Sequence, residues 1–237
     1  MARQARYAAR HVTAFCECVF QDIIPALGDV EKRANEVADG EYHRLCSQPV
    51  GEYGDDDLAT AAEAAHEKGL AFYETMTAVR QSVLNLFAAG LFHLVEQELA
   101  DLCHLEPESL APPTDTKIYV TADWYRQHFG LDLRSLDPWQ MVDDLRLVAN
   151  TVKHAEGKSA ADLRQRRPEL FRHPIDRKLF PNETHSIGFV RPVRSPLSGE
   201  DLYISEEALH EFAQAAEKFV AEVVDYFERH ASEHFPR

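Results

Sequence analysis

Apolar residues recur at helical spacing along most of the chain. The first such stretch covers residues 5–48 and repeats apolar side chains at steps of four, at Phe15, Val19, Ile23 and Leu27. Pro25 is expected to kink or break this helix because proline has no backbone N–H to donate. The longest stretch runs from Leu58 to Leu105, and another begins at Ser205 and continues towards the C-terminus. The pattern therefore predicts long helices on both sides of the central region.

The central region is expected to add further helices. Asp137 is a typical N-cap residue and Pro138 suits the first helical position, so a helix is predicted from there to His154. Shorter helices are expected near Trp124–Phe129 and from Ser159 to Arg167, before the next proline. These elements supply the remaining helices of a single core.

Residues 172–204 interrupt the pattern, because they contain four prolines and no helical periodicity. Two short extended pieces, Ile187–Val190 and Leu202–Ile204, are predicted to form a minor β-hairpin. No composition shift divides the chain, so residues 1–237 are interpreted as one domain with 172–204 as an irregular insertion. The predicted fold class is all-α, a helical bundle of four to five long helices with that minor hairpin.

Composition and charge exclude several classes of protein. The formal net charge of −15 and the apolar fraction of 45% describe a folded globular protein without the overall basic charge of a nucleic-acid coat. The four cysteines form no CxxC pair, and nucleotide-binding, serine-esterase and zinc-protease motifs are absent. No leader peptide and no uncharged apolar run of about 18 residues is found. We therefore expect a cytoplasmic protein without a membrane span, metal or other cofactor.

A polar stripe near the end of one predicted helix carries the most distinctive chemistry. Arg146, Asn150 and His154 follow at steps of four, so their side chains line one helix face with a drift of about 40° per step. Lys153 adds a second cation at the same end, and Gly157 is expected to end the helix. A neighbouring face carries the apolar residues expected in the core, Leu145, Val148 and Val152. The row of basic, amide and imidazole groups suits binding of a phosphodiester and transfer of a proton.

The same stripe also has a structural interpretation. A histidine at the end of a helix often meets the negative end of the helix dipole. Asn150 could likewise be buried and bonded to a neighbouring loop. Asparagine is a poor helix former, however, and its position in the middle of a helix favours a functional reason.

The motif Asn150-Thr151-Val152-Lys153-His154, near the end of a helix in a helical bundle, resembles that of the HEPN superfamily. The resemblance covers roughly Leu58–His154. Its members are small all-α domains that commonly dimerise, and many are metal-independent RNases of toxin–antitoxin and antiviral defence systems. The resemblance implies an endoribonuclease that acts on RNA as a homodimer, with an antitoxin or other regulatory protein as a further partner.

One position departs from the family motif. The family most often has arginine directly before the polar residue, whereas Ala149 precedes Asn150 here. The nearest arginine, Arg146, is separated from His154 by seven residues rather than four to six. The chain is therefore either an inactive HEPN-like fold or an enzyme that uses Arg146, Lys153 or an arginine from a partner subunit.

The resemblance also implies roles for the residues of the stripe. His154 would act as general base on a ribose 2′-OH or as general acid on the leaving oxygen. Arg146 would hold the non-bridging phosphate oxygens, Asn150 would orient the histidine or the phosphate, and Lys153 would bind substrate. Two copies facing each other across a two-fold axis would form one composite cleft.

Two alternatives from other functional classes remain open. One is a non-catalytic, dimeric helical module that senses or scaffolds and keeps the stripe for structural reasons. The other is a di-metal carboxylate protein, because Glu63 with His66 and Glu207 with His210 show the i, i+3 spacing of di-iron bundles. Roughly one such pair is expected by chance, so two pairs are weak support for a metal site.

Overall fold

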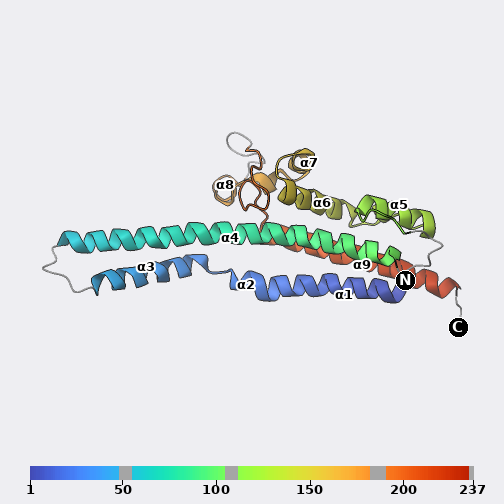
Figure 1. Cartoon of the computed structure of the whole chain (residues 1–237), viewed down its shortest axis with the longest axis horizontal. Coiled ribbons are helices and arrows are strands. Elements are labelled where there is room, and N and C mark those ends of the chain that lie inside the picture. The colour runs from blue at the N-terminus through green and yellow to red at the C-terminus, as the bar shows by residue number, and fades with distance from the viewer. Residues whose placement is uncertain (48–54, 105–111, 182–190, 235–237) are drawn as a thin grey trace.

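The chain is represented by a computed structural model that describes residues 1–47, 55–104, 112–181 and 191–234 (Figure 1). The described residues are all-α, because they form helices joined by turns and include no strand. The long helices are α1 (Ala2–Cys18), α3 (Val30–Cys46), α4 (Asp55–His104), α6 (Trp139–His154) and α9 (Glu206–His234). The shorter elements are η1 (Val19–Ile23), α2 (Ile24–Ala26), α5 (Ile118–Phe129), η3 (Leu133–Ser135), α7 (Lys158–Arg166), η4 (Pro168–Phe171) and α8 (Pro174–Leu179).

Helices α4 and α9 lie between α1 on one side and α6 on the other (Figure 1). Both α1 and α6 pack against this central pair, and the core fills the space between them. Phe92, Phe212 and Phe219 are fully buried there. Because burying a phenylalanine side chain contributes about 1.5–3 kcal/mol, these rings are a main source of stability.

Helix α3 and the N-terminal part of α4 form an antiparallel arm that projects beyond this core (Figure 1). The two helices approach closely at Gly69. A Cβ at this position would lie 2.9 Å from the Cβ of Ala38 and 3.0 Å from the carbonyl oxygen of Ala34. The absence of a side chain at Gly69 therefore allows the two helices of the arm to pack at this distance.

The prediction that Pro25 interrupts the first helical stretch is confirmed. The chain passes from α1 through the π-helical turn η1 and the short α2, and it leaves the helix before α3. Pro25 can neither donate to the carbonyl four residues earlier nor avoid a clash with it. At the start of α3, Asp29 has a φ of 55°, which turns the chain back into a helix.

Helix α4 confirms the longest predicted helix and runs without interruption through Gly69 and Gly90. By length and composition, the stretch Leu58–His104 is apolar enough to cross a membrane. Its C-terminal part also supplies core residues, including Leu91 and Phe92, and a core helix of this kind meets the same criteria.

Helix α6 ends at His154 as predicted, but both of its cap residues differ from those predicted. Pro138 is the N-cap and Trp139 the first helical residue, whereas the predicted N-cap Asp137 pairs with Lys218 of α9. At the other end, Ala155 rather than Gly157 is the C-cap, with a φ of 59°. The chain turns at Ala155, and the backbone N–H of Glu156 then donates to the carbonyl of Val193.

The irregular insertion contains one helix that the sequence did not predict, α8. The described second half of the insertion, residues 191–204, packs across α4 and η4. The predicted hairpin arm Leu202–Ile204 is not a strand, and the arm Ile187–Val190 lies outside the described residues. Instead of pairing in a sheet, Tyr203 N–H donates to the carbonyl of Leu170 at 2.7 Å. The backbone groups of this segment are thus satisfied by helices rather than by a partner strand.

Asn85 of α4 holds the same segment from the opposite side. Its amide, which is fully buried, donates to the carbonyls of Ser198 at 3.2 Å and Leu202 at 2.9 Å. Gly199 lies directly on the α4 backbone, where a Cβ would be only 2.7 Å from the amide nitrogen of Ser82. The 191–204 segment is therefore fitted tightly against α4.

Candidate functional site

The residues of the predicted stripe all lie on α6, which the core holds by its apolar face. Leu145, Val148 and Val152 are buried as expected. Ala149 is also completely buried, with 0% of its surface exposed. The position that carries the motif arginine in the HEPN family therefore faces the core here, and it has no space for a long charged side chain.

Arg146 is held by neighbours on two helices. Its Nε donates to Oδ1 of Asp143 at 2.7 Å, and its guanidinium carbon lies 5.0 Å from the centre of the Tyr119 ring on α5. Only 19% of the Arg146 side chain is exposed. The carboxylate neutralises the charge of this arginine locally, and the ring restricts its movement.

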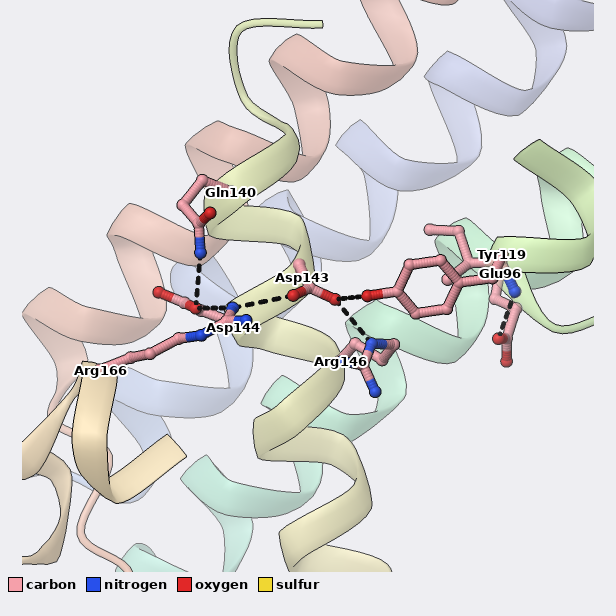
Figure 2. A network of polar contacts seen from close by, with 8 residues as sticks. Glu96, Tyr119, Gln140, Asp143, Asp144, Arg146 and Arg166 are labelled. Atoms are coloured by element: carbon pink, nitrogen blue, oxygen red, sulfur yellow. Dashed lines mark hydrogen bonds and ion pairs between the residues drawn. The ribbon is translucent and has the colours of Figure 1, made fainter. Parts of the chain in front are cut away.

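Asp143 is the centre of a network that joins three helices (Figure 2). Besides Arg146, its carboxylate accepts from the hydroxyl of Tyr119 on α5 at 2.5 Å and from Nη1 of Arg166 on α7 at 2.8 Å. Asp144 accepts from the same Arg166 nitrogen at 2.9 Å and from Gln140 at 3.2 Å. The network thus attaches α5 and α7 to α6.

The protonation of this network follows from its geometry. Burial disfavours the charged form of Asp143, but hydrogen bonds from Arg146, Tyr119 and Arg166 outweigh it and hold the pKa of this carboxyl below its ordinary value. Burial and the bond to Asp143 raise the pKa of Tyr119, and bonds to the two carboxylates raise that of Arg166. Asp143 and Arg166 are therefore charged at neutral pH, whereas Tyr119 is neutral.

His154 and Lys153 stand at the exposed end of α6. Both side chains are exposed, and Asn150 is partly buried one turn before them. Within the described part of the chain, no hydrogen bond or ion pair engages these three side chains. His154 lies about 12 Å from Arg146 along the helix axis, at 1.5 Å per residue. The structure therefore leaves the imidazole accessible, two turns away from an arginine that is already engaged.

The 191–204 segment closes around this end of α6. Leu197 N–H donates to the carbonyl of Val152 at 2.7 Å, and Glu156 N–H donates to the carbonyl of Val193 at 2.9 Å. Val193 N–H also donates to the Glu156 carboxylate, at 2.9 Å. These bonds satisfy groups at the C-terminus of α6 and position the segment next to His154.

Two further cations lie on the segments that adjoin the His154 end of α6. Lys158 begins α7, and Arg194 follows the residue that is bonded to Glu156; both side chains are exposed. Among the described residues, neither makes an ion pair, whereas Arg164 nearby is bonded to Glu156 through two nitrogens. With Lys153, they give the His154 end of α6 a local positive charge on a protein of net charge −15.

The network that joins Asp143 to Tyr119 and Arg166 was not predicted from the sequence. The i, i+3 spacing of Asp143 and Arg146 is a local signal for an ion pair. Tyr119 and Arg166 lie more than 20 residues away on other helices, and no spacing rule connects them to Asp143. Only the packing of α5 and α7 against α6 brings them together.

The two ExxH pairs do not form part of a larger cluster of metal ligands. The described residues contain no group of three or more His, Cys, Asp or Glu side chains arranged to hold a metal ion. His210 instead stacks on Phe20, with ring centres 3.6 Å apart and planes 11° from parallel. No observation therefore favours the di-metal alternative.

Comparisons of the chain with protein-family models, curated proteins and solved structures find no match. The function of the candidate site therefore has to be inferred from its own chemical groups. An accessible imidazole, an adjacent amide and unpaired cations can bind a phosphate group and exchange a proton with a hydroxyl.

Proposed function

We propose that this chain is a metal-independent endoribonuclease of the HEPN type, with His154 as its general acid–base. The observation that carries the proposal is the exposed His154, free of partners among the described residues, at an end of α6 whose adjoining segments carry the exposed cations Lys153, Lys158 and Arg194. An accessible imidazole can accept a proton from a hydroxyl and donate one to a leaving oxygen.

The proposed reaction uses the 2′-hydroxyl of the RNA as nucleophile. His154 accepts its proton, the 2′-oxygen attacks phosphorus, and the 5′-oxygen leaves with a proton from a second acid. In a homodimer with a two-fold cleft, the partner subunit's His154 supplies that proton. Asn150 orients the phosphate, and Lys153 with its neighbouring cations stabilises the developing negative charge. The products are a 2′,3′-cyclic phosphate and a 5′-hydroxyl.

Arg146 has an indirect role in this proposal. Its bond to Asp143 and its position two turns from His154 favour anchoring of α6 over direct binding of the scissile phosphate. The exposed cations take the place of the family's motif arginine. The biological setting that goes with this activity is a cytoplasmic toxin or antiviral effector, controlled by an antitoxin or other regulatory protein.

The test is cleavage of total cellular RNA by the purified protein in EDTA. We expect His154→Ala to lower the cleavage rate by about 10²–10⁴-fold, which is the usual contribution of a general acid–base. His66→Ala, which removes another exposed histidine from α4, should leave the rate unchanged. Cleavage that persists in His154→Ala, or wild-type cleavage that EDTA abolishes, would contradict the proposal.

A specific observation favours the non-catalytic module as the second candidate. Ala149 is fully buried at the position of the motif arginine, and Arg146 is engaged by Asp143. An interaction module needs neither residue for chemistry. Failure of the wild-type protein to cleave any RNA in the total cellular pool, together with an intact dimer, would favour this function.

A further inference from the structure

Helix α1 carries a row of arginines on a surface remote from His154. Arg3, Arg6 and Arg10 occupy positions i, i+3 and i+7, so they lie on one face of the helix. All three side chains are exposed. The first acidic residue of the chain is Glu17, so this half of α1 carries only positive charge on a protein of net charge −15. Such separation of charge indicates an anionic ligand.

The arginines line a groove of about 570 Å³ between α1 and α9. Its apolar floor comprises Ala9, Ala221 and Val224, and Asp225 is the one carboxylate that lines it. Arg6 is bonded to Glu228 of α9 at 3.1 Å, so its charge is already balanced. Arg3 and Arg10 have no ion pair among the described residues. Two guanidinium groups without an ion pair to the described residues therefore line the groove.

The charges that line the two grooves beside α1 favour an anionic ligand in the groove between α1 and α9. A second groove of about 720 Å³, between α1 and α4, shares Arg3 and Arg10 but also contains Glu98 and Asp101. Those carboxylates repel an anion, although His11 engages Glu98 at 2.7 Å. The α1–α9 groove is therefore the more favourable position for negative charge.

The row is long enough to contact more than one phosphate of a nucleic-acid strand. Arg3 and Arg10 are separated by about 10 Å along the helix axis, at 1.5 Å per residue. Successive phosphates in one strand of a DNA duplex are about 3.4 Å apart along its axis, and those of an extended single strand are further apart, so the two arginines can contact two different phosphates. Tyr7 lies between the two arginines with 53% of its surface exposed, and Arg10 lies 5.8 Å from its ring centre. Bases stack on exposed aromatic rings beside arginine.

We propose that Arg3 and Arg10 in the α1–α9 groove, with Tyr7 on the adjoining α1–α4 side of the arginine row, form a second, non-catalytic binding surface for single-stranded RNA. It lies across the α4–α9 layer from α6, so it holds a part of the RNA that is distant from the cleaved bond (Figure 1). The choice of RNA as ligand rests on the proposed function, but binding and cleavage are separate measurements. The surface adds affinity for long substrates without contributing a catalytic group.

The test measures binding of a fluorescent 15-nucleotide oligouridylate as a function of salt, in a His154→Ala background that does not consume the probe. We expect Arg3→Gln/Arg10→Gln to raise Kd about tenfold and to reduce the slope of log K against log salt by about 1.4, the value for two lost phosphate contacts. Asp225→Asn should tighten binding, because it removes the carboxylate from the groove.

The matched control is Lys32→Gln/Arg33→Gln on α3, which makes the same change in net charge on the projecting arm. It should leave both Kd and the salt slope unchanged. The proposal is overturned by equal losses in the two double variants, by an unchanged Arg3→Gln/Arg10→Gln variant, or by no binding at all. Tighter binding of polyglutamate than of RNA would also overturn it, in favour of an acidic protein partner. Wild-type protein that binds the oligouridylate but cleaves no RNA would contradict the proposed function alone.

Discussion

Replacing Asp143 with alanine is expected to lower the free energy of unfolding by about 3 kcal/mol, because it leaves two arginines without their shared carboxylate. Asp143 is only 7% exposed and accepts from Tyr119, Arg146 and Arg166. Arg166 keeps Asp144 and is partly exposed, so most of the cost falls on Arg146 and Tyr119. For a chain of this size, the midpoint of thermal unfolding should fall by about 6–12 °C.

Urea unfolding followed by circular dichroism measures this effect. Asp123→Ala is the matched control, because Asp123 also pairs with an arginine, Arg134 at 2.9 Å, but is 56% exposed. Its loss should cost less than about 1 kcal/mol. Equal destabilisation by the two substitutions would show that the buried network does not hold α5 and α7 against α6.

The same network predicts how stability depends on pH. The folded-state pKa of Asp143 lies below its unfolded value, so its contribution is fully present above the unfolded pKa, which is about 3.9. The contribution is lost as the pH falls through the folded-state pKa. The stability difference between wild type and Asp143→Asn should therefore be constant from pH 5 to 7 and shrink in more acidic solution. A difference that grows below pH 4 would have the wrong sign.

The second large effect is expected at Asn85. Replacing it with alanine should lower the free energy of unfolding by about 2–4 kcal/mol, because it leaves two carbonyls unpaired and a cavity in the core. Those carbonyls belong to Ser198 and Leu202. Asn85→Asp should be at least as harmful, since it keeps the shape but turns the donor towards those carbonyls into an acceptor.

Hydrogen exchange distinguishes loss of this anchor from general destabilisation. The amide of Leu197, bonded to Val152, should lose protection first in Asn85→Ala, because it belongs to the anchored segment. Asn35→Ala on the exposed face of α3 is the control and should change stability by less than about 0.5 kcal/mol. Unchanged protection at Leu197 would mean that Asn85 does not hold the segment next to His154.

The helices and the polar stripe could be predicted from the sequence because both depend on local geometry. Helical periodicity located α4 and α9, and Pro25 marked the break after α1, since proline acts on its own turn of the backbone. Steps of four placed Arg146, Asn150 and His154 on one face whatever the rest of the fold. The cap residues of α6 were misplaced by one or two positions, because contacts with other segments decide which residue caps a helix.

The state of each stripe residue was decided by the tertiary structure alone. Burial of Ala149 depends on which face of α6 meets the central helices, and the engagement of Arg146 depends on Tyr119 from another helix. The predicted strand Leu202–Ile204 became an irregular segment because Asn85 and Leu170 satisfy its backbone. Such contacts join residues that are distant in the chain, so they leave no periodic signal. Local sequence therefore determined the helices and the order of polar groups, whereas packing determined which of those groups remain accessible.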